Sequence, residues 1–287
     1  MEILIGGLII LLCLLLAALV FTAGVLGLSV LLSFTVAWYE RLGHEPAAAE
    51  RQPAKAAFLM AREFASLLLT LLLRPLGWLP AFPLWRRPRR TPVILLHGLF
   101  QNRSCLLLLH WHLSAAGYDQ VLSINTPPWL DLDTLVDRVA RAVEQACRET
   151  GAARVHLVGH SMGGILARCY IQLHGGAERV AGCVTIGTPH AGSKLAPFAV
   201  SRLGRELLPG SPLLTRLHAA PLPGGVRFTS IYSQHDNIVL PADSARLDGA
   251  DNIELAGIGH TSLLFSPAVA QDVVKALTHP SLLTEPS

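Results

Sequence analysis

The chain has 287 residues, of which 51% are hydrophobic and 15% charged, and its net charge at pH 7 is +3. A chain of this length buries one full core and has residues to spare. The few basic residues stand among apolar segments rather than along one polar face, which argues against nucleic acid as a partner.

The N-terminal segment 3–39 contains no charged residue. As a single helix it would be about 55 Å long, against a hydrocarbon core of about 30 Å. We therefore predict a membrane anchor over residues 1–40, formed by two short spans that turn near residues 22–24 or by one tilted helix with an interfacial overhang. A cleaved secretory signal is the alternative, but the acidic Glu2 and the length of the apolar stretch argue against it.

Residues 41–90 are predicted to form a basic, membrane-proximal linker. Its apolar run after Glu63 is too short to span a bilayer and precedes prolines and arginines, which suits a helix in the headgroup region. Packing of this helix on the following domain is an equally good interpretation. The basic flank predicts that the catalytic domain lies on the cytoplasmic face of the membrane. The flank comprises Arg41, Arg51, Lys55, Arg62, Arg74, Arg86, Arg87, Arg89 and Arg90.

From Thr91 onward, short apolar runs alternate with helical stretches, which predicts an α/β domain over residues 91–287. The alternation favours a doubly wound, mostly parallel sheet of about six strands with helices on both faces. Ligands of such a sheet bind at the carboxyl ends of its strands. The expected strands lie within 93–98, 120–125, 155–160, 182–189, 227–233 and 252–257, and the expected helices at 104–116, 132–150, 161–174, 194–217 (a looser region) and 268–279.

The sequence GHSMG at 159–163 stands between an expected strand and an expected helix. This is the G-x-S-x-G pattern, in which a serine nucleophile occupies a sharp turn. The residues two positions before and after the serine must be small, because a Cβ would clash with the adjacent backbone. A serine that merely caps the helix is the alternative. The strand before and the helix after favour Ser161 as a nucleophile.

A serine hydroxyl needs a histidine base and an acid that holds the histidine. His260 follows the last expected strand and Asp236 follows the strand before it, in the chain order expected for this fold. We therefore predict Ser161, Asp236 and His260 as a catalytic triad. The rival acids, which look like turn residues, are Asp243, Asp248 and Asp251. The other histidines considered are assigned to loops near the site (His97, His160, His190) or to helices, strands and their ends (His110, His112, His156, His174, His279).

An anionic intermediate on the serine requires two N–H donors. Met162 is predicted to supply one and Leu99, in a glycine turn after the first strand, the other, with Phe100 as the alternative to Leu99. Phe100, His160 and His190 are also predicted to contact the substrate. No cofactor or metal is expected. The cysteines lack CxxC or His-paired metal spacing and are interpreted as buried free thiols, with disulfides as the alternative.

Together these motifs resemble the α/β-hydrolase superfamily and, within it, compact bacterial lipases and esterases that lack a large lid. The resemblance implies a minimal α/β-hydrolase fold and hydrolysis of lipid or acyl esters through an acyl-enzyme on Ser161. The apolar segment 194–225, which contains several prolines, is expected to cover the site as a small cap. The similar stretches are LLHGLFQN, VGHSMGG, IGTPHAGS, YSQHDNIVLP and GADNIELAGIGHTSLLFSP, within residues 91–280.

Two other functions are compatible with the same residues. The triad would also serve acyl transfer to an alcohol or amine, or amide hydrolysis. The non-catalytic alternative is a membrane-bound scaffold whose pocket only binds an acyl ligand.

Overall fold

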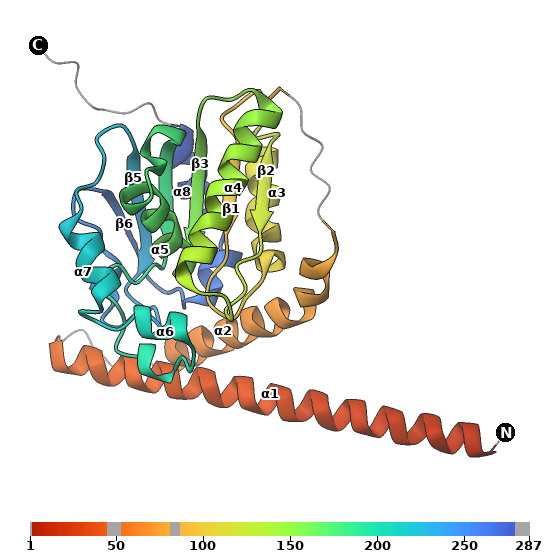
Figure 1. Ribbon diagram of the computed structural model, residues 1–287. Helices are drawn as coiled ribbons and strands as arrows, with labels where there is room; N and C mark the ends of the chain where they lie inside the picture. The colour runs from red at the N-terminus through yellow and green to blue at the C-terminus, as the bar shows by residue number, and fades with distance from the viewer. Residues whose placement is uncertain (1, 45–52, 81–86, 279–287) are drawn as a thin grey trace, which may run out of the picture.

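The computed structural model of the protein describes residues 2–44, 53–80 and 87–278 (Figure 1). Two long N-terminal helices lie against one end of an α/β domain. Three residues discussed in the sequence, Arg51, Arg86 and His279, lie outside the described ranges.

The domain is built on a six-stranded sheet with the order β2-β1-β3-β4-β5-β6. Every neighbouring pair is parallel, which confirms the predicted sheet. Each run of β-branched and apolar residues forms a strand, and the strands at the centre of the sheet are buried on both faces. The strands are β1 (Val93–Leu96), β2 (Val121–Ile124), β3 (Val155–His160), β4 (Val180–Ile186), β5 (Arg227–Ser233) and β6 (Asp251–Leu255).

Helices cover both faces of this sheet (Figure 1). On one face α4 and α5 pack with the apolar sides of β1 and β3, and on the other α3 and α8 do so. The segment predicted as a loose cap contains a short 3₁₀ helix, η5 (Ala196–Phe198), followed by α6 and α7. The domain helices are α3 (Leu107–Ala115), α4 (Leu132–Thr150), α5 (Met162–Arg168), α6 (Arg202–Glu206), α7 (Pro212–Ala219) and α8 (Pro267–Thr278).

Helix α4 shows how local sequence sets the element boundaries. The Asp131 side chain accepts a hydrogen bond from the Thr134 N–H at 2.8 Å and caps the start of the helix. Gly151 ends it in the left-handed conformation, at φ 73°. These two signals give the helix the bounds that the sequence predicts.

The N-terminal apolar segment is one continuous helix, α1 (Glu2–His44), of 43 residues. Its length is about 65 Å. The predicted turn near residues 22–24 is therefore wrong, and the single long helix is correct. No proline interrupts the segment, and the Thr22 hydroxyl is satisfied inside the helix by the Ala18 carbonyl at 2.8 Å.

Helix α2 (Pro53–Leu73) packs on α1 and also on the α/β domain. Val30 and Phe34 of α1 form a buried apolar cluster with Leu59 of α2. By length and composition alone, two segments of the described chain are suited to cross a membrane, Ile5–Gly43 and Ala54–Trp78. Helix α2 packs on the domain, and its place in the headgroup region stays a prediction.

Candidate active site

Ser161 stands at the sharp turn between β3 and α5. Its backbone has φ +53° and ψ −122°, a strained conformation for a residue that is not glycine. A Cβ on Gly159 would lie 2.4 Å from the Gly164 nitrogen, and one on Gly163 would lie 2.4 Å from the Leu96 carbonyl oxygen. Both positions therefore exclude a side chain, as the sequence pattern predicts.

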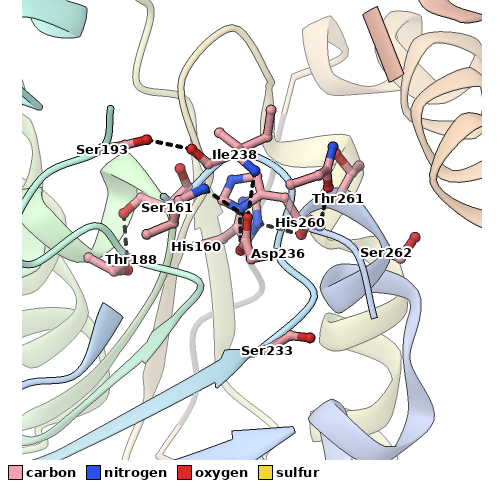
Figure 2. Close-up of polar contacts among 12 residues, drawn as sticks. His160, Ser161, Thr188, Ser193, Ser233, Asp236, Ile238, His260, Thr261 and Ser262 are labelled. Carbon is pink, nitrogen blue, oxygen red and sulfur yellow. Dashed lines mark hydrogen bonds and ion pairs between the residues drawn. The ribbon is translucent and has the colours of Figure 1, made fainter. Parts of the chain in front are cut away.

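His260 and Asp236 form a buried hydrogen-bonded pair (Figure 2). The Nδ1 atom of His260 lies 2.8 Å from Oδ2 of Asp236. The other carboxylate oxygen of Asp236 accepts the N–H groups of Ile238 and Val239, each at 2.8 Å. Because the two backbone N–H groups fix the carboxylate, it holds the imidazole in one orientation.

Opposing effects set the pKa of His260. Burial lowers the pKa, but the negative charge and hydrogen bond of Asp236, together with the charge of Glu63, raise it by more. The net shift is upward from the ordinary value. A base whose pKa lies nearer to neutral pH is better suited to take a proton from a serine.

Ser161, His160 and His260 line a common cavity of about 780 Å³. Figure 2 shows Ser161 grouped with His160, Asp236 and His260 beyond the ends of the strands. The structure thus brings together the three residues that the sequence predicts as a triad. Among the described residues, the rival acids make no bond to His260. Asp251 begins β6 and pairs with Arg227 at 2.8 Å, Asp243 lies in the short 3₁₀ helix η6 (Ala242–Ala245), and Asp248 lies in a turn before β6.

The loop after β1 approaches Ser161 closely, since a Cβ on Gly98 would lie 3.0 Å from the Ser161 Cβ. Burial lowers the pKa of His97 to about 4, so its imidazole is neutral. Its Nε2 accepts the Thr126 N–H at 2.9 Å, and its Nδ1 therefore donates to the Gly98 carbonyl at 2.8 Å. Because that carbonyl and the Leu99 N–H point in opposite directions from one planar peptide, His97 fixes the direction of the Leu99 N–H.

Of the three predicted substrate contacts, Phe100 and His160 line the cavity. Phe100 has φ +59°, a strained turn conformation that the sequence did not reveal. His190 is a correction: it is fully buried outside the cavity lining, between Arg168 (3.1 Å) and Thr185 (3.0 Å). It follows a strand end, as expected, but its ring turns inward and contacts α5 and β4.

Comparison with known proteins places this geometry in a family. A family model described as the α/β-hydrolase fold matches residues 91–236, which make up about half of the chain and contain both Ser161 and Asp236. The chain belongs to the α/β-hydrolase family. His260 lies beyond the matched residues of this α/β hydrolase.

Two curated relatives of this α/β hydrolase are triacylglycerol lipases. That of Pseudarthrobacter phenanthrenivorans is 45% identical over 56 residues, which are 20% of this chain and 17% of the relative. That of Pseudomonas fragi is 29% identical over 128 residues, which are 41% of this chain and 43% of the relative. The match thus spans less than half the length of either relative.

A solved structure with the same fold is that of a lipase from Bacillus licheniformis in its mature form. It superposes with a TM-score of 0.58 at 20% identity and covers 68% of this chain and 96% of the lipase. At this identity the similarity concerns the fold of the α/β hydrolase alone.

Sequence reasoning missed Glu63, an acidic residue of α2 that is only 1% exposed. Its carboxylate accepts the N–H groups of Thr261 at 2.6 Å and Ser262 at 2.9 Å, and the Ser262 hydroxyl at 2.7 Å. These residues open the short 3₁₀ helix η7 (Thr261–Phe265) directly after His260. The one available signal was a lone acid before a run of apolar helix residues. An acid in such a place is costly to bury unless it is hydrogen-bonded.

A second contact joins α1 to His260 through Asn237 in the loop after β5. The Asn237 amide donates to the Ser33 hydroxyl of α1 at 2.8 Å, and its carbonyl accepts the His260 N–H at 3.0 Å. Ser33 and Asn237 are both buried. The backbone on either side of the His260 ring is therefore held by both N-terminal helices of this α/β hydrolase.

Replacing Glu63 with glutamine should lower kcat/KM for an ester about ten- to hundredfold, because an NH₂ group replaces one of the two acceptor oxygens that fix the backbone beside His260. It should also move the acidic limb of the pH profile. Glu63 raises the pKa of His260, so its removal lowers that pKa and the base form persists to lower pH. The other groups around the imidazole, Asp236 and the neutral His160, are unchanged.

The matched control is Ser66→Ala, which removes a contact between the same helix and Ser262 at 3.1 Å but no charge. It should leave the acidic limb in place. An acidic limb that stays at the wild-type pH in Glu63→Gln, with the protein folded, would contradict the role assigned to Glu63.

The cysteines of the domain are free thiols, which confirms that interpretation over disulfides. Cys105, Cys147, Cys169 and Cys183 are all buried and unbridged. Burial raises the pKa of Cys169 and of Cys183 to about 12, so neither thiol is reactive at neutral pH. Within the described ranges, no group of three or more His, Cys, Asp or Glu side chains is placed to hold a metal ion.

Proposed function

We propose that this α/β hydrolase is a serine hydrolase that cleaves carboxylic esters. The observation that carries the proposal is the buried pair of His260 and Asp236, 2.8 Å apart, at the cavity into which the strained Ser161 turn opens. This is the constellation of nucleophile, base and orienting acid that ester hydrolysis requires.

In the proposed mechanism, Nε2 of His260 takes the proton from Ser161 Oγ as the oxygen attacks the ester carbonyl carbon. Collapse of the tetrahedral intermediate breaks the bond to the alcohol oxygen, which leaves with the proton from His260. A water molecule then gives a proton to His260 and attacks the acyl-enzyme, and the carboxylic acid is released as the proton returns to Ser161. Asp236 keeps the proton of the resting imidazole on Nδ1 and stabilises the charged form.

The negative charge of the intermediate is assigned to two backbone donors. Met162 N–H opens α5, where the positive end of the helix faces the serine. Leu99 N–H is the second donor, and its direction is supported by the hydrogen bond between His97 and the Gly98 carbonyl.

The substrates are proposed to be lipid or acyl esters, and the protein to be anchored in a membrane. The curated relatives that match parts of the chain are triacylglycerol lipases, and α1 carries an exposed apolar surface along most of its length. In this proposal residues 1–40 are the anchor and 41–90 the membrane-proximal linker, with the catalytic domain at 91–287. The basic residues that follow α1 favour the cytoplasmic face of an inner membrane for the site.

The test is hydrolysis of p-nitrophenyl esters of graded chain length and of phospholipid vesicles by the full-length protein, with Ser161→Ala as the background. We expect activity above that background and a preference for longer acyl chains. Equal rates in the two proteins would refute the catalytic assignment. A strong preference for acetyl over longer chains would refute the lipid assignment, and transfer of the acyl group to an added alcohol or amine in preference to water would make the protein an acyltransferase.

A further inference from the structure

We propose that the two N-terminal helices form part of the substrate site itself: α1 and α2 build the wall against which the acyl chain of a membrane lipid ester lies. This inference rests on the proposed function. It differs from a role for these helices as an anchor alone, because it assigns them to recognition of the substrate.

One face of α1 lines the cavity that contains Ser161 and His260. Its cavity-lining residues recur at helical spacing, so they form a stripe along one side of the helix. The clearest members of the stripe are Leu26, Ser29, Ser33 and Val36. The next side of the helix packs on α2 through Val30 and Phe34. The C-terminal half of α1 thus divides its surface between the cavity and α2.

Helix α2 contributes a second stripe to the same cavity. Leu67, Thr70 and Leu71 line it, followed by Arg74 just after the helix end. The buried contacts of Glu63 and Ser66 with η7 fix this stripe relative to His260. The two helices therefore contribute mainly apolar side chains to the wall of the cavity that contains Ser161.

The opposite wall comes from the segment that the sequence marked as a cap. Leu195, Ala196 and Phe198 line the cavity from that side. Lys194, next to them, forms an ion pair with Glu40 of α1. Figure 1 shows α6 of this segment beside α1. The cavity thus lies between the end of the sheet, the cap segment and the two N-terminal helices.

The chemistry of these walls selects an acyl chain as the occupant. At about 780 Å³ the cavity falls in the usual range for small-molecule ligands, about 300 to 1,000 Å³. The side of α1 away from the cavity and from α2 exposes Leu28 (56%) and Leu31 (51%), a surface suited to lipid. The helix that lines the site is therefore the same helix that presents a lipid-compatible surface.

The experiment places a tryptophan on the cavity-lining stripe of each helix. The matched controls place the same side chain on the exposed side of each helix. Ser29→Trp and Thr70→Trp fill the cavity wall, whereas Leu28→Trp and Leu72→Trp add the same side chain to exposed positions outside it. Full-length proteins are compared in detergent micelles with p-nitrophenyl acetate and p-nitrophenyl palmitate. Hydrolysis of the acetate reports an intact triad, because its acyl group is too short to need the wall.

We expect the ratio of kcat/KM for palmitate to that for acetate to fall at least about tenfold in Ser29→Trp and Thr70→Trp, and to stay within about twofold of wild type in the controls. The inference is wrong if the cavity variants retain the wild-type ratio, or if both controls lose it equally. Failure of the proposed function looks different, because the wild type would then hydrolyse neither ester above the Ser161→Ala background.

Discussion

Replacing Ser161 with alanine is expected to lower kcat for ester hydrolysis by about a millionfold. The variant lacks the atom on which the acyl-enzyme forms, while the cavity and the oxyanion donors stay in place. Alanine is compatible with the packing around this turn, because the neighbours that need space are Gly159 and Gly163. The measurement is the single-turnover and steady-state rate of p-nitrophenyl ester hydrolysis by purified variant and wild type.

Combining Ser161→Ala with His260→Ala tests the same assignment more sharply. Since Ser161 and His260 act as one unit, His260→Ala should cost about as much as Ser161→Ala, and the combination should cost no more than either. Additive losses would show that the two residues serve separate processes. Thermal unfolding of each variant, followed by circular dichroism, provides the control for folding.

Asp236→Asn is expected to lower kcat by about ten-thousandfold without disturbing the fold. The reason lies in the hydrogen bonds of the carboxylate. Oδ1 accepts the N–H groups of Ile238 and Val239, so the oxygen of an asparagine must occupy that position. Its NH₂ group then faces Nδ1 of His260, which must accept, and the imidazole proton moves to Nε2. In that tautomer His260 has no acceptor for the serine proton.

The matched control for this substitution is Asp243→Asn, at one of the rival acids. It makes the same chemical change in the short 3₁₀ helix η6, at an exposed position, and should leave kcat within about twofold of wild type, as for a surface site outside the network. A loss in Asp243→Asn as large as in Asp236→Asn would overturn the assignment of the acid.

The sheet and the proximity of the three candidate triad residues were predictable from the sequence because they follow from local patterns and one topological rule. Short apolar runs with β-branched residues gave six strands, and parallel order brings their carboxyl ends together. Ser161, Asp236 and His260 each follow such an end, so their proximity needed no knowledge of side-chain packing.

The parts that failed depend on contacts between distant segments. The sequence pattern predicted that His190 follows a strand end. It did not predict that the His190 ring turns inward toward Arg168. Nothing in the sequence near Glu63 shows that its partners are Thr261 and Ser262, nearly two hundred residues away. The expected turn near residues 22–24 came from matching the segment to the thickness of one bilayer, whereas part of α1 lies on the domain instead.

The most direct test of the central claim, that Ser161 is the nucleophile of an ester hydrolase, is labelling of the folded, membrane-reconstituted protein with a fluorophosphonate, followed by mass spectrometry of its peptides. We predict one covalent adduct per chain, on Ser161, which is absent from Ser161→Ala and strongly reduced in His260→Ala. Absence of labelling in the folded wild-type protein, or an adduct on another residue, would contradict the claim and favour a fold that only binds an acyl ligand.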